Sequence, residues 1–75
     1  YLVEDFIKAE IFLKRAVELM PEDPTVNDHY GDILWKLNRK IQARYFWANV
    51  LSLEETEEDM KKDINNKLIE GLKNS

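Results

Sequence analysis

The chain has 75 residues, a formal net charge of −4 and no cysteine. A chain this short forms one domain with a small core, and without cysteine neither a disulfide nor a thiolate-bound metal can stabilise it. Two glycines and two prolines allow few turns, which excludes a many-stranded β fold and favours a few regular elements.

The first half of the chain predicts two helices joined by a short turn. Apolar residues recur at helical spacing after Glu4 and Asp5, either of which can open the first helix, and Pro21 ends it. The turn that follows predicts Asp23 as the N-cap of a second helix with Pro24 at its first position. This second helix should end in a left-handed turn at Asn38 and Arg39. Its apolar stripe consists of Val26, Tyr30, Ile33, Leu34 and Leu37.

The second half predicts two more helices. The third runs from about Lys40 to Leu53. Residues Thr56 to Asp59 resemble a capping box, with acids at the positive end of a fourth helix. The stripe of that helix consists of Met60, Ile64, Leu68 and Leu72. With no candidate strand, the fold class is all-α, with about four helices in antiparallel succession.

A repeat becomes visible when the sequence is shifted by 34 residues. Residues 7–13 then lie over residues 41–47. The identical pairs are Ile7/Ile41, Ala9/Ala43, Phe12/Phe46 and Leu19/Leu53. Other pairs, such as Leu13/Trp47, stay apolar, and the polar mismatches are Lys8/Gln42, Glu10/Arg44, Lys14/Ala48 and Arg15/Asn49. The repeat therefore preserves a core and leaves the solvent faces free to differ.

The period and its residue types resemble the tetratricopeptide repeat, a helix-turn-helix motif of 34 residues. Tyr30, Gly31 and Leu34 match its first helix, while Ala43 and Trp47 match its second. Asn27 and Glu55 stand where the family carries Trp and Pro. The preceding copy supplies Ala9, Leu13, Ala16 and Pro21. In this family such residues serve repeat packing, because small residues let two helices approach closely and a large aromatic fills the space between pairs.

The resemblance implies an α-solenoid that forms a right-handed superhelix. Residues 1–23 would be an incomplete repeat, 24–57 a full repeat and 58–75 a polar capping helix that ends a longer array. The parent protein is expected to be bacterial. The implied function is a non-enzymatic protein-protein interaction module; the alternative is a structural C-terminal cap, with binding or catalysis elsewhere in the parent protein.

The resemblance also selects a candidate partner-binding groove, because the first helix of each pair lines a concave surface in this family. The candidates on the second predicted helix are Asp28, Asp32, Trp35 and Lys36, and those on the fourth are Lys62, Asn66 and Ile69. The acids favour a partner segment with basic residues and argue against a carboxylate clamp built on Lys62 and Asn66. The simpler reading is that Trp35 packs against a neighbouring helix and the acids are solvated.

The sequence gives little support for a metal site, a catalytic site or a nucleic-acid-binding site. His29 is the single histidine, so we predict a surface residue and no metal site. The chain has two serines and no glycine-rich phosphate loop, which argues against an enzyme and leaves no candidate catalytic residue or cofactor. The basic stretch from Lys36 to Arg44 lies in an acidic chain, and we expect it to be a solvated junction that binds no nucleic acid, with Lys40 and Arg44 paired with acids.

The N-terminal end of the repeat predicts an exposed apolar face. If Tyr1, Leu2 and Val3 are the remainder of a preceding helix, the first predicted helix lacks part of its cover. Its apolar residues there are Phe6, Ile7, Phe12 and Leu13. We expect an exposed patch or self-association through it. The longest apolar run, Tyr45 to Ala48, is too short for membrane insertion.

Overall fold

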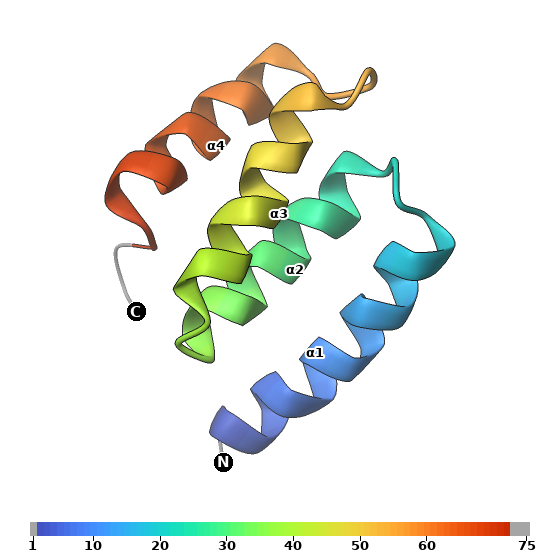
Figure 1. Ribbon diagram of the computed structural model, residues 1–75, viewed down its shortest axis with the longest axis vertical. Coiled ribbons are helices and arrows are strands. Elements are labelled where there is room, and N and C mark those ends of the chain that lie inside the picture. The colour runs from blue at the N-terminus through green and yellow to red at the C-terminus, as the bar shows by residue number, and fades with distance from the viewer. Residues whose placement is uncertain (1, 73–75) are drawn as a thin grey trace.

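The computed structural model describes residues 2–72, with side chains from Glu4 onward. This part of the chain consists of four α-helices and contains no strand: α1 (Leu2–Leu19), α2 (Pro24–Lys36), α3 (Lys40–Ser52) and α4 (Glu58–Glu70). Successive helices run up and down in turn (Figure 1). The all-α class and the antiparallel order are therefore confirmed. Tyr1 and residues 73–75, which belong to the first and last predicted segments, lie outside the described residues.

The first helix begins earlier than predicted. Leu2 and Val3 are part of α1, so they are not the remainder of a preceding helix, and the expected opening at Glu4 or Asp5 is wrong. Those two acids lie in the first turn of α1, where the partial positive charge of the helix end stabilises them. Acids near an N-terminus mark the first turn of a helix without fixing the residue at which it starts.

Local signals place the two ends of α2 correctly. The Asp23 carboxylate accepts a hydrogen bond from the Val26 backbone N–H at 3.1 Å, and Pro24 takes the first helical position. This bond satisfies one of the backbone donors that a helix start leaves free. At the other end Asn38 has φ 65°, the left-handed conformation that reverses the chain into α3.

The capping box predicted before α4 is wrong. Glu57 is the N-cap residue and its side chain makes no capping bond. The Thr56 hydroxyl instead donates to the Val50 carbonyl oxygen at 2.6 Å, and Thr56 is buried. Thr56 therefore satisfies a carbonyl at the C-terminal end of α3, where helices leave acceptors without partners.

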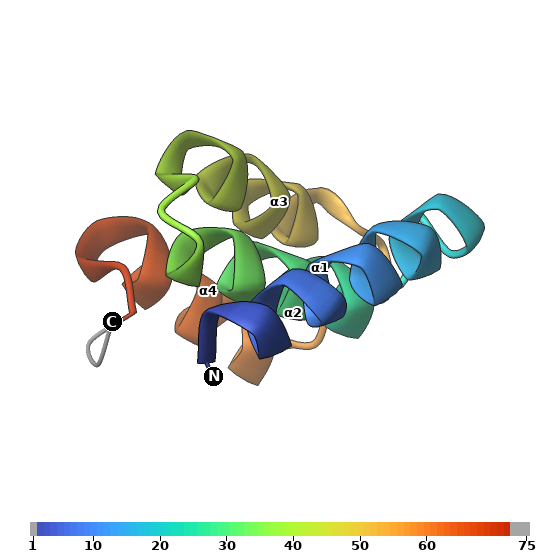
Figure 2. The ribbon, with the colours of Figure 1, turned by 90° about the horizontal axis from the view of Figure 1, so that it is seen from below.

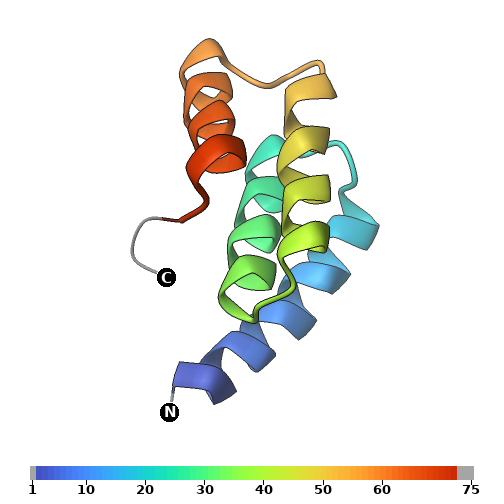
Figure 3. The ribbon, with the colours of Figure 1, turned by 60° about the vertical axis from the view of Figure 1, so that its left-hand side comes forward.

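The helices pack in sequence order around α2 and α3. The most extensive contact joins α2 to α3; α1 packs on α2, and α4 packs on α3. Helices α1 and α4 lie on opposite sides of the central α2 and α3 (Figure 1). Seen from below, α3 lies above α2 and α4 (Figure 2), and the turned view also separates α4 from α1 (Figure 3). No helix among residues 2–72 has the length and apolar character needed to cross a bilayer.

The core lies where α2, α3 and α4 meet. Its buried members are Tyr30, Leu34, Trp35, Ala43, Trp47, Val50 and Ile64. Trp47 is fully buried, and a Cβ on Gly31 would lie only 2.5 Å from its ring. A glycine at this position is therefore what allows α2 to pack against the large ring.

Candidate functional site

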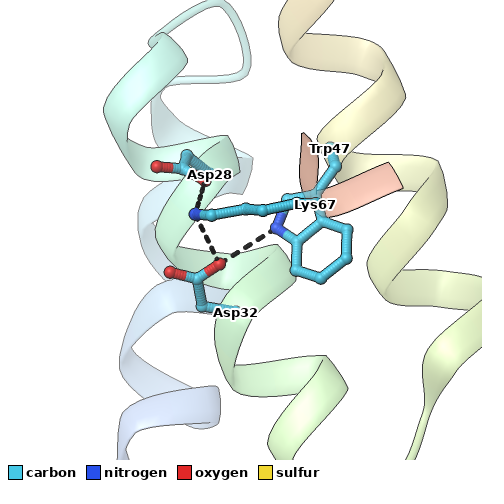
Figure 4. Close-up of polar contacts among 4 residues, drawn as sticks. All are labelled: Asp28, Asp32, Trp47 and Lys67. Carbon is cyan, nitrogen blue, oxygen red and sulfur yellow. Dashed lines mark hydrogen bonds and ion pairs between the residues drawn. The ribbon is translucent and has the colours of Figure 1, made fainter. Parts of the chain in front are cut away.

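Three charged side chains form an ion cluster between α2 and α4. Asp28 and Asp32 are one helical turn apart, so they lie on the same face of α2. The Lys67 ammonium of α4 donates to Asp28 at 2.7 Å and to Asp32 at 2.9 Å (Figure 4). All three side chains are mostly shielded from water, with exposed fractions of 16% to 28%. The two carboxylates predicted to face a partner thus share one ammonium group within the chain.

The ion cluster is connected to the core through a tryptophan. The Trp47 indole N–H donates to Asp32 at 3.0 Å, and the Lys67 ammonium lies 5.8 Å from the centre of the same ring (Figure 4). Asp32 therefore accepts from two donors on two other helices. Because a buried indole N–H without a partner is costly, this bond helps to fix the orientation of Trp47.

Lys67 holds its charge strongly. Burial lowers the pKa of an ammonium group, but the hydrogen bonds and negative charges of Asp28 and Asp32 raise it, and the net effect places the pKa of Lys67 above its ordinary value of 10.5. Lys67 consequently keeps its charge at neutral pH, which suits a structural contact between helices.

Trp35 is an internal residue. Its side chain is 9% exposed, and its ring lies 5.4 Å from that of Trp47. The Lys40 ammonium and the Arg44 guanidinium lie 4.8 Å and 5.6 Å from the centre of the Trp35 ring. The structure thus agrees with the reading in which Trp35 packs against a neighbouring helix, and the expected pairing of Lys40 and Arg44 with acids is replaced by cation–π contacts.

The remaining groove candidates are accessible. Lys36, Lys62, Asn66 and Ile69 are exposed, and Ile69 has 78% of its surface in solvent. Lys36 lies 5.2 Å from the Phe6 ring of α1. The seven predicted partner-binding residues therefore divide into three internal ones on α2 and four exposed ones, of which three are on α4.

The predicted packing residues also divide into two groups. Tyr30, Gly31, Leu34, Ala43 and Trp47, from the full repeat, are all buried. From the preceding copy, the half-buried residues are Ala9, Leu13 and Ala16, and Pro21 is exposed. The Pro21 carbonyl oxygen accepts a hydrogen bond from the Asn27 amide, so this residue contributes to the turn and not to the buried surface.

Sequence reasoning missed the role of Asn27. This side chain is 1% exposed; its amide donates to the carbonyls of Pro21 and Asp23 at 3.0 Å and 2.9 Å, and its oxygen accepts from Asn49 at 3.1 Å. Asn27 thus joins the α1–α2 turn to α3. A polar residue at a position where the repeat family carries a core tryptophan was the available signal.

Sequence reasoning also missed Lys67. It lies three residues after the core residue Ile64, hence beside the apolar stripe of α4. A lysine at that edge opposite two acids on α2 was a weak signal, because only the packing of α2 and α4 brings the groups together.

No metal or acid–base centre is visible in the described part of the chain. Among residues 4–72, no three His, Asp or Glu side chains lie close enough together to hold a metal ion, and His29 is exposed. Every buried side-chain nitrogen or oxygen there has a hydrogen-bond partner.

Comparisons of the chain with protein-family models, with curated proteins and with solved structures find no match.

Proposed function

We propose that the chain is a non-enzymatic protein-protein interaction module built from tetratricopeptide-like helix pairs, part of a right-handed solenoid. The repeat offset supports this architecture. On α3 the residues that face the core of the domain are Ala43, Trp47 and Val50. Their counterparts on α1, which form its more buried side, are Ala9, Leu13 and Ala16. The close contact of Gly31 with Trp47 also supports the proposal, because a small residue there lets α2 approach α3 closely.

The observation that carries the function is the exposure of large apolar side chains on such a small chain. Among residues 4–72 the exposed ones are Ile7, Ile11, Phe12, Leu19, Met20, Ile41, Tyr45 and Ile69. Single exposed apolar residues are ordinary, but a concentration of them on a small polar surface marks interaction sites. All but Met20 and Ile69 lie on α1 and α3.

The groove on α2 and α4 remains part of the proposal, with a smaller set of residues. Lys36, Lys62, Asn66 and Ile69 are accessible to a partner. The preference for a basic partner segment is weakened, because Asp28 and Asp32 are half-buried and already pair with Lys67.

The test uses exposed residues, so that binding changes without loss of the fold. Ile69→Lys combined with Lys62→Glu should remove the partners that co-purify with the parent protein, while the melting curve by circular dichroism stays unchanged. Lys8→Glu on α1, also exposed, is the matched control and should keep every partner. An unchanged set of partners in the double variant contradicts groove binding.

A structural cap is the second candidate, favoured by one observation. Phe46 is half-buried against Tyr30, with ring centres 4.6 Å apart, whereas its counterpart Phe12 is 73% exposed. A further helix packed on α1 in an array would cover Phe12 in the same way. Phe12→Lys should then lower the melting temperature of the parent protein and leave that of the chain alone unchanged; equal effects in both would contradict the cap.

A further inference from the structure

The outer face of α3 carries a row of exposed residues opposite the core. Ile41 and Tyr45, 87% and 67% exposed, are followed at the same face by Ala48 and Ser52, which are also exposed. We call these four residues the outer stripe of α3. Steps of four, three and four residues are those of a seam along which one helix packs on another.

The charged residues of α3 itself are both positive, whereas Glu22, Glu54 and Glu55 lie around Ser52 at the C-terminal end of the outer stripe. Helix α3 contains Lys40 and Arg44 and no acidic residue. Among residues 4–72 every ion pair involves other residues, so these two cations are held by the Trp35 ring and not neutralised by a carboxylate. On a chain of net charge −4, this is a local site of attraction for negative groups.

The aromatic residue of the outer stripe is held in place by ring contacts within the protein. The Tyr45 ring meets Phe46 edge-on with ring centres 5.1 Å apart, and Phe46 packs in turn on Tyr30 of α2. A side chain already held by packing loses less freedom when a partner covers it.

The equivalent face of α1 lacks this combination. Its positions are Ile7, Ile11, Lys14 and Glu18, so the apolar row ends after two residues. Phe6 and Glu10 stand where Lys40 and Arg44 flank the outer stripe. The feature therefore belongs to α3 and is not a general property of the repeat.

We propose that the outer stripe of α3 docks an acidic amphipathic helix of a partner protein, with its apolar side chains on Ile41 and Tyr45 and its carboxylates facing Lys40 and Arg44. The inference rests on the proposed function as an interaction module and adds a second surface to it. The acids elsewhere on the chain, including those around Ser52, repel such a helix and so direct it to the N-terminal half of α3, where Lys40 and Arg44 lie. A second copy of the chain is the competing occupant, because its α1 also exposes large apolar side chains and contains acidic residues; a dimer in sedimentation would reveal it.

The test uses two synthetic helical peptides with the same row of leucines, one flanked by glutamates and the other by lysines. Fluorescence anisotropy should show at least roughly tenfold tighter binding of the glutamate peptide, weakening as salt rises. Amide chemical shifts of residues 40–52 should change on binding. Ile41→Ser combined with Tyr45→Ser should weaken binding at least roughly tenfold, while the matched pair Ile7→Ser and Ile11→Ser leaves it unchanged.

Several outcomes would overturn the inference. These are equal binding of the two peptides, no binding of either, no effect of the α3 variants, or a dimer in sedimentation that those variants abolish. Tighter binding to vesicles of phosphatidylcholine and phosphatidylglycerol through the same residues would also overturn it, in favour of a membrane. The groove variants Lys62→Glu and Ile69→Lys test a different face, so failure at α3 would leave the proposed function standing.

Discussion

Helices α1 and α3 share a sequence pattern but differ in burial. Ala43, Trp47 and Val50 of α3 are fully buried, whereas their counterparts on α1, 34 residues earlier, are half-buried. Helix α3 packs on both α2 and α4, while the contact that covers α1 comes from α2. The comparison teaches that a repeat sequence specifies which face of a helix is apolar, and that the neighbouring helices decide how much of that face is buried.

The largest loss of stability is expected when Trp47, the large residue at the centre of the buried face of α3, is replaced. Trp47→Ala should cost about 3–5 kcal/mol, because it leaves a cavity and two polar partners without their indole contact. That is a large part of the roughly 4–11 kcal/mol expected for a domain of this size. The counterpart change Leu13→Ala should cost about half as much, since Leu13 is half-buried. Urea unfolding of both variants measures the difference, and equal losses would break the comparison.

A smaller effect tests the close contact of α2 with α3. In Gly31→Ala the new methyl group would lie 2.5 Å from the Trp47 ring and 3.2 Å from the Ala43 carbonyl oxygen. Crowding should outweigh the better helix propensity of alanine and give a net loss of about 1–2 kcal/mol.

The matched double variant identifies the cause of that loss. Trp47→Leu installs in α3 the leucine that α1 carries at the equivalent position, so Gly31→Ala should cost less in that background. Thermal melts of the four proteins give the coupling. If Gly31→Ala costs the same in both backgrounds, crowding by Trp47 is not the cause.

The next effect concerns the tie that holds α4 in place. Lys67→Met keeps the length of the side chain and removes its charge, leaving Asp28 and Asp32 to repel each other in a mostly shielded place. We expect a loss of about 1–2 kcal/mol at neutral pH, measured by urea unfolding. If α4 packed less closely, α3 would also become less buried, as α1 is. A variant as stable as the original would contradict a structural role for the ion cluster.

The same group predicts a loss of stability in alkali. The pKa of Lys67 is raised in the folded state, so its contribution is fully present below about 10.5 and is lost as pH rises through the folded value. Burial, followed by the Glu10 charge, raises the pKa of Tyr30 above 10.0, and the sign is the same because folding favours the protonated phenol. Melting temperatures should therefore fall above about pH 10.

Two variants separate the contributions to that fall. Lys67→Met should reduce it and leave the part due to Tyr30, while Tyr30→Phe should leave the part due to Lys67. An alkaline fall of unchanged size in both variants would show that other groups cause it.

The smallest effect is expected at the exposed counterpart of a packed aromatic. Phe12→Ala should change stability by no more than about 0.5 kcal/mol, whereas Phe46→Ala should cost about 1–2 kcal/mol through loss of its contact with Tyr30. Differential scanning calorimetry at two protein concentrations measures both. A large loss at Phe12 that grows with concentration would show that another copy covers α1.

Much of the fold could be predicted because its signals are local. Asp23 and Pro24 start α2, and Asn38 reverses the chain after its end. Each of these residues acts on backbone groups only a few residues away. Helical spacing with the 34-residue offset also placed Trp47 in the core. Thr56 misled, because its hydroxyl has two ways to satisfy a helix end and the sequence does not distinguish them.

The candidate site was less predictable because its chemistry depends on packing. Asp28 and Asp32 were identified from their place on α2, but the lysine that pairs with both is 35 to 39 residues away on α4. Trp35 was assigned to a groove from the repeat register, and its burial against Trp47 depends on how closely α2 and α3 approach. Helix periodicity predicts on which face of its helix a residue lies, but it does not predict which residue of another helix it will contact.

Amide hydrogen exchange followed residue by residue tests the central comparison most directly. If neighbouring helices set the burial of each repeat, the amides of α3 should exchange only through global unfolding, and those of α1 through a local opening of lower free energy. The expected order is strongest protection at Ala43, Trp47 and Val50, and clearly weaker protection at Ala9, Leu13 and Ala16. Equal protection of the two sets would contradict the account.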